Sequence, residues 1–256
     1  MSKAMLIDTS KCLNCSACSV ECKRRNQVPV GQNIFYTRML TFEKGEYPAV
    51  KAYFIKKACN HCTQAVCVDV CPTHALAHHP DGYVTLDQEK CNGCGYCSQY
   101  CPFGVPQLQI VNAFTGAAKA NKCTFCVDRL AEGLPTACAS ACPFGAISFG
   151  EREALLEQGK ARVAVLQSQG KPAARLYGEN ELGGLHVLYV LEDVPSAYGL
   201  PDAPKYPALN TVRTVVGGAG GAALGLAIVG LALNWLSARG KIHAEEKFVG
   251  EQTDDK

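Results

Sequence analysis

The sequence has no strong excess of charge and few aromatic residues. Of its 256 residues, 19% are charged and 8% are aromatic, and the formal net charge is +2. This balance excludes the strongly basic nucleic-acid binders and the acidic tail proteins, so we expect no nucleic-acid partner. Residues 1–8 contain neither a long apolar run nor twin arginines. We therefore expect no export signal in the chain itself.

Cysteine is distributed very unevenly. Residues 143–256 contain none, whereas residues 12–142 contain all sixteen. They form four runs of four: Cys12, Cys15, Cys18 and Cys22; Cys59, Cys62, Cys67 and Cys71; Cys91, Cys94, Cys97 and Cys101; Cys123, Cys126, Cys138 and Cys142. Every run ends in C-x3-C, and proline follows the last cysteine of all but the first run.

The spacing of these runs predicts four [4Fe–4S] clusters. The first and third runs have the C-x2-C-x2-C-x3-C spacing of bacterial ferredoxins, and the others lengthen only the gap before the third cysteine. Three thiolates of one tight loop can bind three irons of a cluster, and the fourth cysteine then reaches a neighbouring cluster. Disulfides fit this clustering poorly, and a [3Fe–4S] cluster is disfavoured because no run lacks a cysteine. Zinc bound by four thiolates is the alternative metal.

The cysteine-rich part also repeats itself. Residues 7–12 are similar to residues 86–91, and the sequence Cys-Pro-Phe-Gly occurs at 101–104 and again at 142–145. Residues 75–87 predict a strand, a tight turn and a second strand between the second and third runs. This duplication predicts two ferredoxin-like units.

The remainder of the chain predicts further regular structure. Residues 151–170 predict a helix, and residues 183–191 predict a buried strand after a glycine turn. The expected fold is α+β, with two interleaved ferredoxin-like units and a single C-terminal transmembrane helix. Its segments are a four-cluster domain at 1–150, a helix-and-strand extension at 151–195, a proline-rich connector at 196–213, a transmembrane helix at 214–236 and a charged tail at 237–256.

A long uncharged segment lies near the C-terminus. Residues 215–236 carry no formal charge, and a helix of about 20 residues spans the hydrocarbon core of a bilayer. Gly217, Gly221 and Gly225 recur every four residues, which would give a smooth face for a partner helix. A buried core helix is the alternative, but glycine weakens such a helix in water. We therefore predict a membrane anchor, with Trp235 at the interface.

The basic residues around this segment indicate its orientation. Lys205 and Arg213 precede it, whereas Arg239, Lys241 and Lys247 follow it. Because positive charge is enriched on the cytoplasmic side, we expect a cytoplasmic C-terminus and a periplasmic cluster domain.

Several segments carry a resemblance to a known family. They are residues 91–97, 122–129, 142–150, 183–191 and 198–201. With them, the sequence resembles the iron–sulfur β subunit of membrane-bound respiratory formate dehydrogenases over nearly its whole length. The cysteine runs alone are typical of a wider group, which includes subunits of hydrogenases, polysulfide reductases and other molybdopterin enzymes.

The resemblance implies a crossed pairing of the runs, the first with the fourth and the second with the third. The implied ligand sets are Cys12, Cys15, Cys18 and Cys142; Cys22, Cys123, Cys126 and Cys138; Cys59, Cys62, Cys67 and Cys101; Cys91, Cys94, Cys97 and Cys71. It further implies electron relay from a molybdopterin or tungstopterin catalytic α subunit to a membrane cytochrome b γ subunit and quinone. Export together with a partner that carries a twin-arginine signal is implied as well.

This function requires no catalytic residue in the chain. His61 could tune a cluster, although packing within its loop is the simpler interpretation. His186 is expected to be a structural residue, and His78 and His79 to be ordinary hairpin positions. Lys122 could line the electron path or be solvated. The competing functions are the iron–sulfur subunit of a membrane hydrogenase or sulfur-compound reductase, a zinc-stabilised membrane scaffold, and a free polyferredoxin.

Overall fold

The computed structural model describes residues 2–29, 31, 33–206 and 229. The first compact unit is Met1–Tyr206, and the second is Pro207–Lys256. None of the helices in the described ranges is long and apolar enough to cross a membrane. Apart from Val229, the transmembrane helix predicted at 214–236 lies outside the described residues, and so does the tail predicted at 237–256.

A four-stranded sheet joins the two ends of the first unit. Its order is β8-β1-β10-β9, formed by Ile147–Glu151, Lys3–Asp8, Val187–Leu191 and Arg175–Tyr177. β1 and β10 are parallel, with Met5 beside Val187, whereas β8 and β9 are antiparallel to their neighbours. The strand predicted within 183–191 is therefore confirmed as β10, and it lies beside the N-terminal strand.

The two faces of this sheet belong to different hydrophobic cores. Ala4 and Leu6 of β1 pack with apolar residues of α6 (Arg152–Ser168), the helix predicted within 151–170. Met5 and Ile7, on the opposite face, pack against the cysteine-rich part of the chain. Because side chains alternate across a strand, β1 holds α6 on one side and supports the cysteine loops on the other.

Strand pairs connect the cysteine runs in a crossed fashion. β1 precedes the first run and pairs with β8, which follows the fourth, with Met5 opposite Phe149. β4 (Leu76–His78) follows the second run and pairs with β5 (Val84–Leu86), which precedes the third. The strands predicted within 75–87 are thus confirmed.

The repeat between residues 7–12 and 86–91 is also a repeat of local structure. The Asp8 carboxylate accepts a hydrogen bond from the amide of Ser10 at 3.0 Å. Asp87 accepts the equivalent bond from the amide of Glu89 at 2.9 Å. In both places this turn leads the chain from a strand into a cysteine run.

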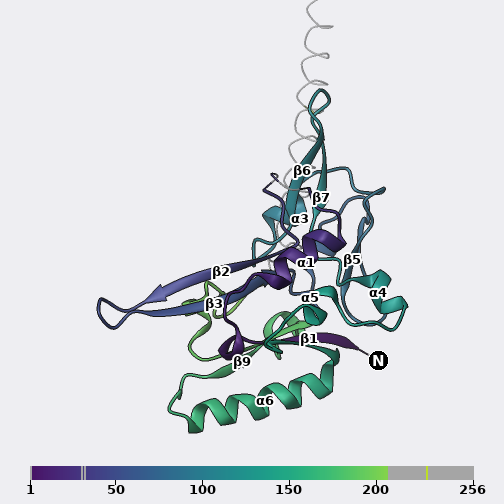
Figure 1. The fold of residues 1–256 in the computed structure, drawn as a ribbon. Coiled ribbons are helices and arrows are strands. Elements are labelled where there is room, and N and C mark those ends of the chain that lie inside the picture. Colours follow the sequence, from purple (N-terminus) through teal and green to yellow (C-terminus); the bar gives the residue numbers. More distant parts are fainter. Residues whose placement is uncertain (1, 30, 32, 207–228, 230–256) are drawn as a thin grey trace, which may run out of the picture. The chain divides into compact units, whose positions relative to one another are not determined.

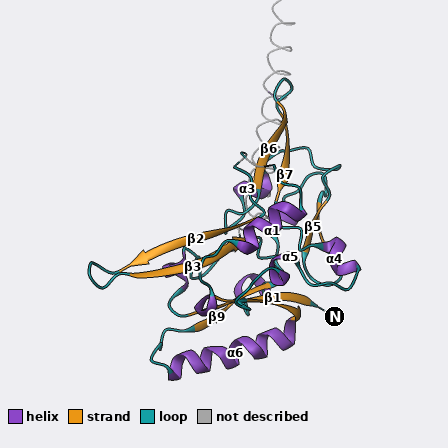
Figure 2. Ribbon diagram, in the orientation of Figure 1, coloured by secondary structure: helices purple, strands orange, loops and turns teal. Residues whose placement is uncertain are grey.

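Short helices and loops carry the cysteines themselves. Figure 2 shows such helices and loops at the centre of the unit. Besides α6, the α-helices are α1 (Ala17–Arg25), α2 (Val66–Asp69), α3 (Tyr96–Gln99), α4 (Val127–Ala131) and α5 (Ala137–Ser140). Three short 3-10 helices complete the described elements: η1 (Thr9–Lys11), η2 (Glu181–Gly183) and η3 (Pro195–Tyr198). η3 lies at the start of the proline-rich connector predicted at 196–213, and its Tyr198 is buried in the core.

Two antiparallel hairpins extend from the rest of this unit (Figure 1). One is β2–β3 (Thr37–Lys44 and Lys51–Ala58), and the other is β6–β7 (Gln107–Asn112 and Ala117–Asn121). Sequence patterns did not predict either hairpin. Each is inserted next to a cysteine run, and β3 ends immediately before Cys59.

Candidate cluster-binding sites

All four cysteine runs contain the same backbone turn. The residue before the second cysteine has a left-handed conformation in every run, with φ of 55°, 47°, 75° and 58° at Asn14, His61, Gly93 and Phe125. This conformation turns backbone amides towards the loop interior. The amide of Phe125 donates to Cys123 Sγ at 3.4 Å, and the amides of Asn14 and His61 make the same bond to the first cysteine of their runs.

The fold gathers cysteines from different runs around shared cavities. Three cavities are each lined by four cysteines, which define site 1 (Cys12, Cys15, Cys18 and Cys142), site 2 (Cys22, Cys123, Cys126 and Cys138) and site 4 (Cys71, Cys91, Cys94 and Cys97). The remaining four define site 3 (Cys59, Cys62, Cys67 and Cys101). There, burial and the charges of Cys59, Cys101 and Cys67 raise the pKa of Cys62.

These groupings coincide with the four ligand sets implied by the family resemblance. That they bind clusters stays a prediction. Over the described residues, no three or more His, Cys, Asp or Glu side chains are arranged to hold a single metal ion.

The chemistry of the thiols fits a metal centre bound by thiolates. Burial raises the pKa of Cys126 and of Cys97 to about 11, so these thiols are neutral without a metal. Coordination to a cationic metal deprotonates a thiol outright. Backbone amides donate to the sulfurs of Cys91, Cys126 and Cys142 at 3.3–3.5 Å, an arrangement that stabilises the thiolate form.

Charge effects connect neighbouring sites. In addition to burial, a thiolate of one site raises the pKa of a cysteine in the next for three pairs: Cys138 on Cys18, Cys59 on Cys123 and Cys97 on Cys67. These pairs connect site 1 with site 2, site 2 with site 3, and site 3 with site 4. Cys15 of site 1 and Cys94 of site 4 are exposed, whereas all four cysteines of site 2 are buried.

Comparisons with known proteins agree with this arrangement. Residues 50–152 match the family model described as a 4Fe-4S dicluster domain. The nitrate-inducible formate dehydrogenase iron-sulfur subunit of Escherichia coli is 36% identical over 79% of this chain and 73% of its own length. The chain belongs to this family of iron–sulfur subunits.

Relatives from other oxidoreductases have similar identity to this iron–sulfur subunit. The thiosulfate reductase electron transfer subunit of Salmonella typhi is 38% identical over 70% of this chain and 92% of its own length. A subunit of the tetrathionate reductase of Salmonella typhimurium is 34% identical over 82% of this chain and 77% of its own length. The family therefore extends beyond formate dehydrogenases.

Two buried lysines lie among the cysteine sites of the iron–sulfur subunit. Lys122 is 1% exposed, and its ammonium donates to the carbonyl oxygens of Val84 at 2.6 Å and Cys123 at 3.0 Å. It is therefore buried and not solvated. Lys56 is 2% exposed and lines the cavities of both site 1 and site 2. Sequence reasoning missed Lys56, because the adjacent Lys57 makes the pair resemble a solvated charge run.

Two histidines of the iron–sulfur subunit, His61 and His186, are buried. His61 is fully buried, and burial lowers its pKa, so the ring is neutral. Its Nδ1 accepts a hydrogen bond from the amide of Val84 at 3.1 Å, and its ring lies 4.6 Å from that of Phe125. His186 Nδ1 lies 2.7 Å from the carbonyl oxygen of Lys3, which confirms the prediction of a satisfied structural residue.

Proposed function

We propose that this chain is an electron-transfer subunit carrying four [4Fe–4S] clusters, held at sites 1 to 4 within two interleaved ferredoxin-like units. The observation that carries this proposal is the division of all sixteen cysteines into four groups of four, three of which line common cavities. Each group supplies four thiols, which is the ligand set of one such cluster. Bound clusters supply one-electron redox chemistry.

The connection of neighbouring sites supports a relay between site 1 and site 4. Site 1 and site 4 each have an exposed cysteine, so an electron donor or acceptor can approach either. The cysteines of site 2 are buried, which limits contact with water and oxidants. The protein therefore holds its redox centres in sequence, shields the inner ones and donates amide hydrogen bonds to their sulfurs.

The proposed partner is a molybdopterin or tungstopterin catalytic subunit that oxidises formate. The 36% identity to formate dehydrogenase subunits supports this choice. A sulfur-compound reductase is the second candidate, because the thiosulfate reductase subunit is 38% identical and nearly all of its length is matched. The large subunit that copurifies, and its activity with formate or thiosulfate, distinguishes the two.

We further propose that residues 214–236 cross the membrane and meet a cytochrome b subunit, with the cluster domain on the periplasmic side. The support is the uncharged sequence of residues 215–236 and the arrangement of basic residues around it.

Purification of the native complex under anaerobic conditions tests the central proposal. We expect about sixteen iron atoms and as many sulfide ions per chain, from four clusters of four irons. Reduction by the physiological substrate should produce the paramagnetic signals of reduced clusters. Stoichiometric zinc in place of iron, or iron that the substrate does not reduce, would contradict the proposal.

A further inference from the structure

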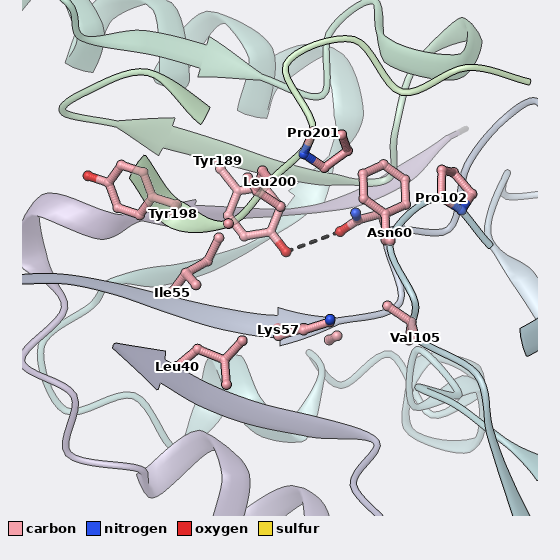
Figure 3. Close-up of a pocket in the computed structure, with 13 residues that line it drawn as sticks. Leu40, Ile55, Lys57, Asn60, Pro102, Val105, Tyr189, Tyr198, Leu200 and Pro201 are labelled. Carbon is pink, nitrogen blue, oxygen red and sulfur yellow. Dashed lines mark hydrogen bonds between the residues drawn. The ribbon is translucent and has the colours of Figure 1, made fainter. Parts of the chain in front are cut away.

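Lys56 has an unusual position in β3. Side chains alternate across this strand, so Ile55 and Lys57 line one cavity of about 60 Å³, drawn in Figure 3, while Lys56 faces the cysteine sites. Its cross-strand neighbour Met39 also lines the cavity of site 1. The main chain is held in place because the hydroxyl of Tyr189 donates to the carbonyl oxygen of Lys56 at 3.2 Å.

The ammonium group of Lys56 lacks a partner among the residues that the structure describes. Nζ is buried, and within the described part of the chain it makes neither a hydrogen bond nor an ion pair. A buried cation without a counter-charge is costly, so a lysine here requires compensation by nearby anions.

The anions that would compensate Lys56 are the thiolate-ligated clusters. Each oxidised cluster with four thiolates carries a net negative charge. Reduction by one electron adds one further negative charge. A fixed cation stabilises the reduced form more than the oxidised form, and in a medium of low dielectric constant the difference is substantial. We propose that Lys56 holds a positive charge between sites 1 and 2 and raises the reduction potentials of both clusters; this rests on the proposed function.

Lys122 provides an internal contrast. It is also buried and lies next to Cys123, but two carbonyl oxygens accept hydrogen bonds from its ammonium. The backbone therefore partly compensates its charge, and the two hydrogen bonds hold β5 against the loop of the fourth run. Lys56 has no such bonds, so its charge acts directly on sites 1 and 2.

The test is a redox titration of the purified complex, followed by electron paramagnetic resonance. In Lys56→Met we expect two of the four cluster potentials to fall by at least 59 mV, a tenfold change in a one-electron equilibrium. Lys56→Arg should restore both potentials towards the wild-type values. Lys51→Met removes a half-exposed charge from the same strand and should change none of them.

The outcomes separate this inference from the proposed function. Wild-type protein without four clusters would overturn the proposed function itself. Full iron content with unchanged potentials in Lys56→Met would overturn only the role of Lys56. Iron loss in Lys56→Met with retention in Lys56→Arg would support a required charge, whereas iron loss in both variants would show that side-chain shape matters and would contradict the inference.

Discussion

At the scale of single residues, the left-handed position before each second cysteine shapes the sites. Asn14, His61 and Phe125 adopt this conformation although each has a Cβ atom. The resulting backbone strain costs roughly 1 kcal/mol or more per residue. The hydrogen bonds that backbone amides donate to the cysteine sulfurs offset this cost. Gly93 adopts it without that penalty, but it has a second constraint, because the hairpin β6–β7 lies directly against it.

Replacing Gly93 should therefore damage one site. A Cβ at this position would lie 2.2 Å from the carbonyl oxygen of Ala118 in β7, so the loop or the hairpin must move. We expect Gly93→Ala to lose about a quarter of the bound iron, since one cluster of four is affected. Iron analysis and the loss of one set of paramagnetic signals measure this effect.

Gly116→Ala is the matched control for Gly93→Ala. Gly116 has a similar φ of 68°, but, apart from its chain neighbours, no atom of the described residues lies within 4 Å of the added Cβ. The Gly116→Ala variant has the backbone strain of a left-handed alanine but no clash between its Cβ and another segment. Its iron content should therefore equal that of the wild type. Equal iron loss in both variants would show that strain alone, and not contact with β7, accounts for the effect.

At the scale of elements, α6 packs tightly on the sheet at Gly159. A Cβ there would lie 2.7 Å from Leu176 and 3.3 Å from Leu6, so the glycine permits this close packing. We expect Gly159→Leu to destabilise the protein by about 1–3 kcal/mol, because overpacking forces side chains from their rotamers. Ala164→Leu, on an exposed face of α6, should have little effect. Urea unfolding under anaerobic conditions compares them; equal midpoints would contradict the packing argument.

Asp193 connects the hairpin β2–β3 to the end of β10. Its carboxylate accepts hydrogen bonds from the Tyr53 hydroxyl at 2.6 Å and the Lys44 ammonium at 2.9 Å, and these lower its pKa to about 2. An unfolded aspartate has a pKa of about 3.9. Because the folded value is lower, the stabilisation is present above about pH 4 and is lost as pH falls towards 2.

The lowered pKa of Asp193 predicts how the stability of the Asp193→Asn variant depends on pH. The variant should have a lower urea midpoint than the wild type at pH 7, and the difference should narrow at pH 3. Glu46→Gln, at an exposed position of the hairpin turn, serves as the control and should show no pH-dependent difference. A constant difference for Asp193→Asn at both pH values would contradict a role of the ionised carboxylate.

At the scale of the whole molecule, site 1 and site 4 of the first unit each have an exposed cysteine. The hairpin β6–β7 also exposes three apolar residues, Ile110, Val111 and Phe114. Leu108 of the same hairpin lines the cavity of site 4. The uncharged segment 215–236 follows in the second unit. Membrane attachment by this segment is the feature that would distinguish a fixed relay from a diffusible carrier.

A charge inside this segment should weaken membrane attachment. An arginine at the centre of a membrane-spanning helix costs about 2.5–3.5 kcal/mol on insertion scales. We expect Ala227→Arg to move the protein from the membrane to the aqueous fraction when the native complex is assembled with the variant. Ala238→Arg, in the charged tail, should leave the distribution unchanged. Membrane retention of both variants would contradict the proposed span.

The cysteine runs were predictable because ligand spacing is a local property. Three thiolates within one loop must match a cluster whatever the rest of the fold does, and the turn before Cys91 follows from the short motif beginning at Asp87. The hairpin at 75–87 and the helix within 151–170 were predicted for the same reason, since turn residues and apolar patterning are adjacent in sequence.

By itself, the sequence determined which residues are candidate ligands and where the local turns, the β4–β5 hairpin and α6 occur. Only the tertiary structure decided that β10 lies beside β1, that cysteines from distant runs share cavities, and that Lys56 lies between two of them. A lysine in a strand has the same local pattern whether it is solvated or buried. Its environment depends on which elements pack over it, and that packing joins residues far apart in the chain.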